Sequence, residues 1–111
     1  MPVDFYHYAS ATIHRLVMAS TPNRVPNFDI YGTPRTVYFT DVLFTSAAAA
    51  ETALLIGAKH PAGPRSSPVF RFDLDVTLCA YTNLGIVPGG TATEYITTGS
   101  LIVTASARLS P

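Results

Sequence analysis

The feature that most constrains the fold is a run of alternating apolar and mostly polar residues at 69–80, which reads VFRFDLDVTLCA. Successive side chains of an extended strand point to opposite faces, so a period of two predicts a strand with one buried face. A helix would scatter the same apolar residues around its circumference. One set of alternate positions is wholly apolar: Phe70, Phe72, Leu74, Val76, Leu78 and Ala80. The other set is largely polar: Val69, Arg71, Asp73, Asp75, Thr77 and Cys79.

Further strands are predicted from β-branched and aromatic residues that lie between turn signals. The aromatic-rich segment 1–10 reads as an edge strand or as an arm that docks on a neighbour. The remaining strands are expected at 11–20, 35–46, 51–59, 69–82, 91–98 and 101–109. Segments that contain proline or glycine are expected to be loops, since proline removes ladder donors and fixes φ: 21–34, 61–68 and 83–90.

The alanine-rich segment 46–58, SAAAAETALLIGA, has two interpretations. Alanine propensity alone favours a helix. We favour a turn followed by a strand at 51–59, because Leu54, Leu55 and Ile56 are contiguous rather than helically spaced. With this choice the sequence contains no clear helix.

These elements predict an all-β fold for residues 1–111, a single antiparallel β-sandwich domain of six to seven strands. A jelly-roll-like arrangement is favoured, because the long proline-containing connections at 21–34 and 61–68 suit crossovers between two sheets better than tight hairpins. A chain of 111 residues is long enough to bury one core without disulfides.

Charged residues are scarce: 13% of the chain against about 25% in a typical globular domain. A small protein with so few charges is expected to expose apolar patches, which usually mark contact surfaces. We therefore expect a homo-oligomer or a subunit docked on a larger assembly. Seven basic and seven acidic residues cancel, so the dense positive field needed for nucleic-acid binding is missing.

Cysteine usage and hydropathy limit the cellular setting. Cys79 is the only cysteine, so an internal disulfide is impossible and a packed thiol is the expected role. No apolar run reaches the roughly 18 residues that a membrane span requires. The N-terminal segment lacks a basic region, so no signal peptide is expected.

Asp73 and Asp75 are the most suggestive pair of titratable residues, because they share one face of the predicted strand about 6–7 Å apart. We favour an ordinary polar face on which Arg71 and these carboxylates meet cross-strand or subunit partners. The alternatives are a calcium site completed by loop carbonyls and a carboxylate pair for sugar hydrolysis.

Other constellations for chemistry are not found in the sequence. His7, His14 and His60 do not form a metal-ligand spacing, and packed or surface imidazoles are expected. The sequence contains no GxSxG elbow and no phosphate-binding glycine loop. We therefore expect no enzyme activity, no cofactor, no metal and no small-molecule substrate.

Twelve aromatic residues offer one further alternative. A cluster of five of them could stack on sugar rings or bases: Phe5, Tyr6, Tyr8, Tyr31 and Tyr38. Subunit packing is favoured because the basic residues are dispersed along the chain. The residues expected to contact a partner lie in the N-terminal segment and in the 21–34 loop: Phe5, Tyr6, Tyr8, Val25, Phe28, Ile30 and Tyr31.

Two stretches resemble small virion structural proteins of tailed bacteriophages. Residues 36–58, TVYFTDVLFTSAAAAETALLIGA, look like a strand that ends in Asp, a half-strand, an Ala/Ser tip and a return strand. Residues 87–110, VPGGTATEYITTGSLIVTASARLS, look like the two-strand finish of those chains. The resemblance implies a jelly-roll or sandwich domain, often trimeric, that acts as a capsid decoration (cement) protein or as part of a head fibre. Without a fibrous extension, the chain resembles the compact, capsid-bound type.

Three function classes follow, of which we favour the first. A capsid decoration subunit would be made in the host cytoplasm, form a homotrimer and stabilise the assembled shell by binding the major capsid protein or another virion protein. It would contact neither nucleic acid nor a membrane. The second class is a small carbohydrate-binding β-sandwich with exposed aromatics. The third is a cupin-like enzyme, which the sparse histidines oppose.

Overall fold

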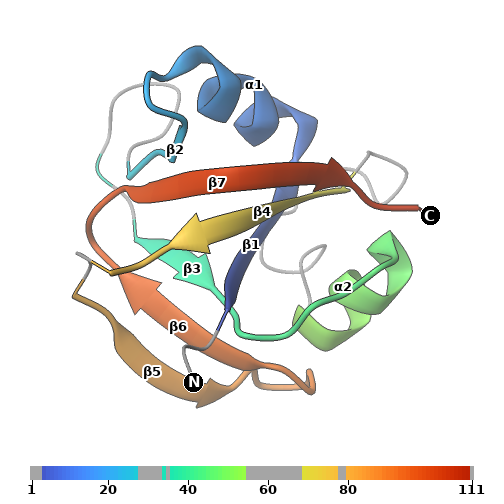
Figure 1. The fold of residues 1–111 in the computed structure, drawn as a ribbon. Coiled ribbons are helices and arrows are strands. Elements are labelled where there is room, and N and C mark those ends of the chain that lie inside the picture. Colours follow the sequence, from blue (N-terminus) through green and yellow to red (C-terminus); the bar gives the residue numbers. More distant parts are fainter. Residues whose placement is uncertain (1–3, 28–33, 35, 55–68, 78–79, 111) are drawn as a thin grey trace.

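Seven strands and two helices are found in the part of the chain that the structure, a computed structural model, describes: residues 4–27, 34, 36–54, 69–77 and 80–110 (Figure 1). In chain order they are β1 (Phe5–Ser10), α1 (Ala11–Ala19), β2 (Arg24–Val25), β3 (Val37–Phe39), α2 (Ala47–Leu54), β4 (Val69–Asp75), β5 (Thr82–Ile86), β6 (Thr93–Thr97) and β7 (Leu101–Arg108).

The strands form two antiparallel sheets. The larger sheet has the order β1-β4-β7-β2, and the smaller has the order β3-β6-β5. A β-bridge joins the sheets, because the Tyr6 N–H donates to the Thr40 carbonyl at 2.7 Å and the Thr40 N–H donates to the Tyr6 carbonyl at 2.9 Å. The predicted all-β antiparallel sandwich of six to seven strands is confirmed. A full jelly roll has eight strands, and the described residues form seven.

The alternating run forms β4, a central strand of the larger sheet. Phe72 is fully buried on one face, whereas Arg71 and Asp73 on the other face are half-buried. The strand is shorter than predicted and ends at Asp75, whose Oδ1 accepts a hydrogen bond from the Thr77 N–H at 2.9 Å. Such a local carboxylate bond is a turn signal that competes with the ladder.

The prediction of a strand at 11–20 is wrong, because residues 11–19 form helix α1. Val17 is fully buried, and Ile13 and Leu16 are half-buried. Their spacing of three and four residues is helical, so one stripe of the helix faces the core. Met18, which lies off this stripe, is 41% exposed.

The prediction of a turn and strand at 51–59 is also wrong, because residues 47–54 form helix α2 and residues 55–59 lie outside the described residues. Alanine propensity decides the structure here. Ser46 precedes the helix, and its Oγ accepts a hydrogen bond from the Ala49 N–H at 3.2 Å. That is the position and contact of an N-cap.

Two further boundaries differ from the sequence-based expectation. The strand expected at 35–46 is reduced to β3, because side chains satisfy the backbone of the following segment: the Tyr8 hydroxyl donates to the Val42 carbonyl at 2.8 Å and accepts from the Phe44 N–H at 2.7 Å. The loop expected at 83–90 begins instead with strand β5. A bulge at Gly85, whose φ is +82°, interrupts the pairing of β5 with β6.

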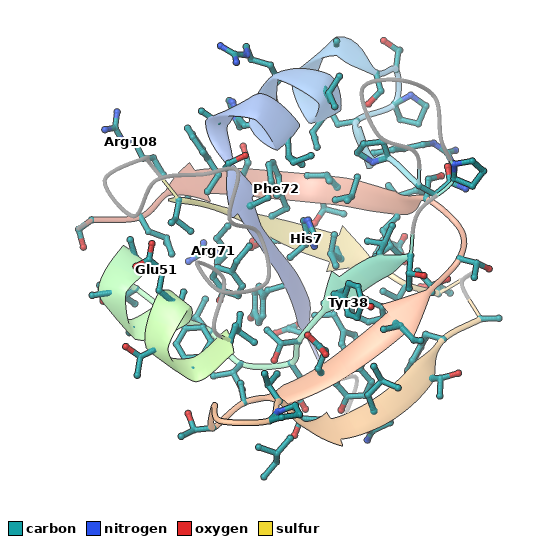
Figure 2. All side chains as sticks on the ribbon, turned by 180° about the vertical axis from the view of Figure 1, so that it is seen from behind. His7, Tyr38, Glu51, Arg71, Phe72 and Arg108 are labelled. Carbon is teal, nitrogen blue, oxygen red and sulfur yellow. The ribbon has the colours of Figure 1, made fainter. Side chains whose placement is uncertain are left out.

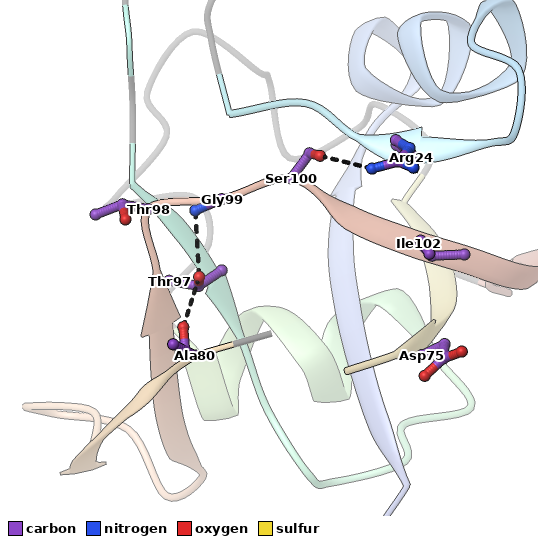
Figure 3. A pocket seen from close by; sticks show the side chains of 8 residues that line it. All are labelled: Arg24, Asp75, Ala80, Thr97, Thr98, Gly99, Ser100 and Ile102. Atoms are coloured by element: carbon purple, nitrogen blue, oxygen red, sulfur yellow. Dashed lines mark hydrogen bonds between the residues drawn. The ribbon is translucent and has the colours of Figure 1, made fainter. Parts of the chain in front are cut away.

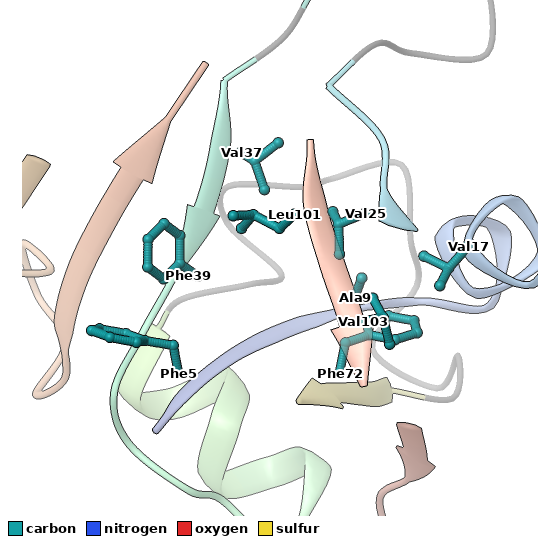
Figure 4. Packing of buried hydrophobic residues seen from close by; sticks show 9 residues of the cluster. All are labelled: Phe5, Ala9, Val17, Val25, Val37, Phe39, Phe72, Leu101 and Val103. Carbon is teal, nitrogen blue, oxygen red and sulfur yellow. The ribbon is translucent and has the colours of Figure 1, made fainter. Parts of the chain in front are cut away.

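The main core lies on one face of the larger sheet, and helix α2 packs against part of the other face. Facing pairs in the ladder share a face, so Phe5, Phe72, Val25 and Leu101 all point to one side of it. There they pack with α1 and the smaller sheet in the main core (Figure 4): Phe5, Ala9, Val17, Val25, Val37, Phe39, Phe72, Leu101 and Val103. On the opposite side, α2 packs in a second cluster: Tyr8, Ala50, Val69 and Leu109.

Candidate interaction surfaces

Of the four predicted contact residues that the structure describes, three lie inside the chain's own core. Phe5, Tyr8 and Val25 are only 7%, 6% and 1% exposed. Tyr6 is half-buried on the outer face of β1, where the Arg71 guanidinium lies 5.9 Å from the centre of its ring. Phe28, Ile30 and Tyr31 lie outside the described residues. The N-terminal segment is therefore a sheet strand, the first of its two predicted roles.

The five aromatics expected to share one platform do not come together. Phe5 and Tyr8 belong to two different clusters, and Tyr31 lies outside the described residues. Phe5 instead joins three aromatic residues outside the expected five, and every pair of ring centroids in this group is between 5.1 and 5.7 Å apart: Phe5, Phe39, Tyr81 and Tyr95. We call these residues the aromatic group. Phe39, Tyr81 and Tyr95 were not predicted to belong to it, because no local sequence pattern distinguishes them.

The aromatic group runs from the core to the surface. Tyr95 is half-buried, and its hydroxyl donates to Oδ2 of Asp41 at 3.1 Å. Burial, followed by this contact with Asp41, raises the pKa of Tyr95. Tyr81 forms the outer end of the group and is 44% exposed. It leads directly into β5.

Strand β5 carries two of the three most exposed large apolar side chains of the described residues, the third being Leu43 at 52%. Leu84 is 49% exposed and Ile86 is 64% exposed. We call Tyr81, Leu84 and Ile86 the β5 edge, because β5 is the outermost strand of the smaller sheet. Residues 76–93 contain no Asp, Glu, Lys or Arg. Edge strands usually carry charge, especially lysine, or proline to prevent pairing with another chain. In β5 only the Gly85 bulge provides such protection.

The outer face of the larger sheet is charged. Nε of Arg71 lies 3.0 Å from Oδ1 of Asp73 on the same strand, whereas the expected partners lay across the strands or on another subunit. Asp75 is exposed, and its hydrogen bonds with Thr77 lower its pKa. Within the described ranges, no cluster of three or more His, Cys, Asp or Glu is placed to hold a metal ion. The calcium and hydrolytic alternatives thus gain no support from this face.

Two histidines take part in packing. Nδ1 of His7 lies 2.5 Å from the Tyr38 carbonyl, and Figure 2 shows His7 beside Phe72 in the interior. His14 stacks on Phe70, with ring centroids 4.0 Å apart and planes inclined by 17°. His60 and Cys79 lie outside the described residues.

An open pocket of about 360 Å³ lies where β2, β4 and β7 meet the turn between β6 and β7 (Figure 3). One basic side chain, one acidic side chain and several hydroxyl groups line it. The lining residues are Arg24, Asp75, Ala80, Thr97, Thr98, Gly99, Ser100 and Ile102. No sequence motif predicted this pocket, because its lining residues come from four separate segments of the chain.

Comparison with known proteins finds no matching family, curated protein or solved structure. Among the described residues, neither helix has the length and apolar character needed to cross a membrane.

Proposed function

We propose that the chain is a non-enzymatic structural subunit of a bacteriophage particle, a capsid decoration protein that forms a homotrimer and binds the assembled shell through apolar contacts. The observation that carries this proposal is the β5 edge, where two large apolar side chains on an uncharged edge strand and Tyr81 just before it are exposed. The scarcity of charge in the whole chain and the resemblance of residues 87–110 to phage structural proteins support it.

Physical chemistry favours contact at the β5 edge over exposure to water. Complete burial of a leucine or isoleucine side chain contributes about 1.5–3 kcal/mol. An added strand would also satisfy the outward-facing backbone groups of β5, as in other complexes formed by strand addition. A subunit that binds only the assembled shell stabilises that shell by mass action.

The oligomeric state is the first test, measured by light scattering on a sizing column. We expect a trimer with about three times the subunit mass of 11.9 kDa. The double variant Leu84→Ser with Ile86→Ser should be monomeric, with an unchanged circular dichroism spectrum. The control is Met18→Ser on α1, another exposed apolar position, which should leave the trimer intact.

Shell binding is the second test, measured by co-sedimentation with empty phage capsids. The native chain should saturate the capsids at a fixed ratio, and the double variant should stay in the supernatant. A native chain that is monomeric at all concentrations and stays in the supernatant with the capsids would refute the proposal.

A further inference from the structure

None of the three side chains of the β5 edge lines the pocket between β2, β4, β7 and the β6–β7 turn. Its lining comes from the outer face of the larger sheet, from Ala80, from Thr97 at the end of β6 and from the turn at 98–100 (Figure 3). A volume of about 360 Å³ lies within the range of small-molecule sites, roughly 300–1,000 Å³. The positions of its polar side chains indicate which class of ligand it binds.

Three lining residues form one row across three neighbouring strands. Arg24 of β2 pairs with Ile102 of β7, and Ile102 also pairs with Asp75 of β4. Directly opposite residues point to the same face, and strands lie about 4.8 Å apart, so the Cα atoms of Arg24 and Asp75 are about 10 Å apart. The Arg24 guanidinium and the Asp75 carboxylate thus lie on either side of the Ile102 side chain, on the same face of the sheet.

The wall beside this row is fixed by hydrogen bonds. The Thr97 hydroxyl donates to the Ala80 carbonyl at 2.9 Å and accepts from the Gly99 N–H at 3.2 Å. Nδ2 of Asn27 donates to the Thr98 carbonyl at 3.1 Å. Nη1 of Arg24 donates to Oγ of Ser100 at 3.3 Å, which holds the guanidinium toward the turn. The pocket is therefore formed before any ligand arrives.

The donor and acceptor types select the ligand class. A guanidinium can only donate hydrogen bonds, an ionised carboxylate can only accept them, and a hydroxyl group does both. A neutral ligand with several hydroxyl groups can therefore accept from Arg24 and donate to Asp75, while its C–H face packs on Ile102. An anion would be repelled by Asp75 and a cation by Arg24.

We infer that this pocket binds a neutral hexopyranose unit of a saccharide. Arg24 and Asp75 are the two residues that hold its hydroxyl groups, and Ile102 is the surface beneath the ring. The pocket uses none of the side chains of the β5 edge, although Ala80 adjoins Tyr81 in the sequence, so a saccharide and an assembly partner would contact different side chains.

Nuclear magnetic resonance titration tests the inference with the methyl glycosides of glucose, galactose, mannose and N-acetylglucosamine. At up to about 50 mM of each, at least one should shift the amide signals of Arg24, Ser100 and Ile102, with a dissociation constant of about 1 mM. Asp75→Asn and Arg24→Gln should each weaken binding about tenfold or more. Asp73→Asn is the matched control, because Asp73 lies on the same strand and face but does not line the pocket.

Three outcomes would overturn the inference. The first is no shift with any of the four glycosides. The second is an equal response to inorganic phosphate, which would indicate an anion site. The third is loss of the oligomer in Asp75→Asn, which would make the pocket a contact between copies. Failure of the assembly proposal is distinguishable, because a monomeric Leu84→Ser, Ile86→Ser variant should still bind the glycoside.

Discussion

The two sheets of this protein present different surfaces. The strands of the larger sheet carry five charged residues, and Arg71 pairs with Asp73 on its outer face. The strands of the smaller sheet carry one, Glu94, which is 7% exposed. The smaller sheet also ends in the apolar β5 edge. The same chain therefore builds one sheet suited to water and another whose outermost strand is suited to a partner.

Residues between the two sheets and residues at the β5 edge are expected to have different roles, the first in the stability of the fold and the second in association with a partner. Apolar residues that fill the space between the sheets stabilise the fold, because their surface is removed from water within one chain. Leu84 and Ile86 remain about half or more exposed, so they contribute little to the fold and retain area for a contact. Substitutions in the two regions should therefore affect different measurements.

Phe72→Ala should give the largest effect. Phe72 is fully buried at the centre of the larger sheet, so we expect a loss of about 3–5 kcal/mol in the free energy of unfolding, measured with urea. Leu84→Ala on the exposed edge should cost less than about 1 kcal/mol. Equal losses at the two positions would mean that the β5 edge belongs to the core, and the comparison would break down.

Gly90→Ala tests how the smaller sheet is tied to helix α2. A Cβ at Gly90 would overlap the Ala53 carbonyl oxygen, which also accepts from the Thr91 N–H at 3.1 Å. The obstacle is backbone, so we expect a loss of about 1–3 kcal/mol in thermal or urea unfolding. Gly99→Ala is the control, because its added carbon would lie 3.8 Å from the nearest atom. Identical stabilities would show that this close approach is not needed.

Tyr8→Phe tests the outer face of the larger sheet and should cost about 1–3 kcal/mol at neutral pH, since the hydroxyl bonds to Val42 and Phe44. Burial raises the pKa of Tyr8 to about 12, above its unfolded value of 10.0. The folded state thus holds this proton more tightly, and the resulting stability is present below pH 10 and lost as the pH rises toward 12.

Urea unfolding across this alkaline range should show a steep decline in the native chain and a weaker one in Tyr8→Phe. Some decline should remain in the variant, because burial also raises the pKa of Tyr6 and Tyr95. Parallel curves for the two proteins would show that Tyr8 does not govern the alkaline limit.

Arg71→Gln should give the smallest effect. The bond to Asp73 is partly exposed, so its loss should cost about 0.2–1 kcal/mol, less at high salt. The oligomeric state should not change, because charges on the larger sheet lie apart from the β5 edge. A monomeric Arg71→Gln variant would show that the charged face of the larger sheet, and not the β5 edge, forms the assembly contact.

The sequence allowed prediction of the sheets better than of the helices. Alternation in β4 has one meaning, because only an extended strand gives a period of two. Residues 11–19 are short and apolar on several sides, so the helical spacing of Ile13, Leu16 and Val17 is hard to tell from a strand that is buried on both faces. For 47–54 we predicted a turn and strand because the leucines are contiguous, but the alanine run forms helix α2 and Ser46 caps it. Neither the aromatic group nor the pocket has a local signature, since each is assembled from distant segments.

Strand β7 has a consequence for the order in which the molecule can form. It lies between β4 and β2, although both precede it in the chain, and Arg24 and Ser100 at this junction are 76 positions apart. Until residues 101–108 have been synthesised, β2 and one side of β4 have no partner strand. Such distant pairings are slow to form, on the order of milliseconds to seconds. A growing chain therefore leaves β2 and one backbone edge of β4 unpaired until β7 has been made, and in that interval these edges are open to aggregation or to a chaperone.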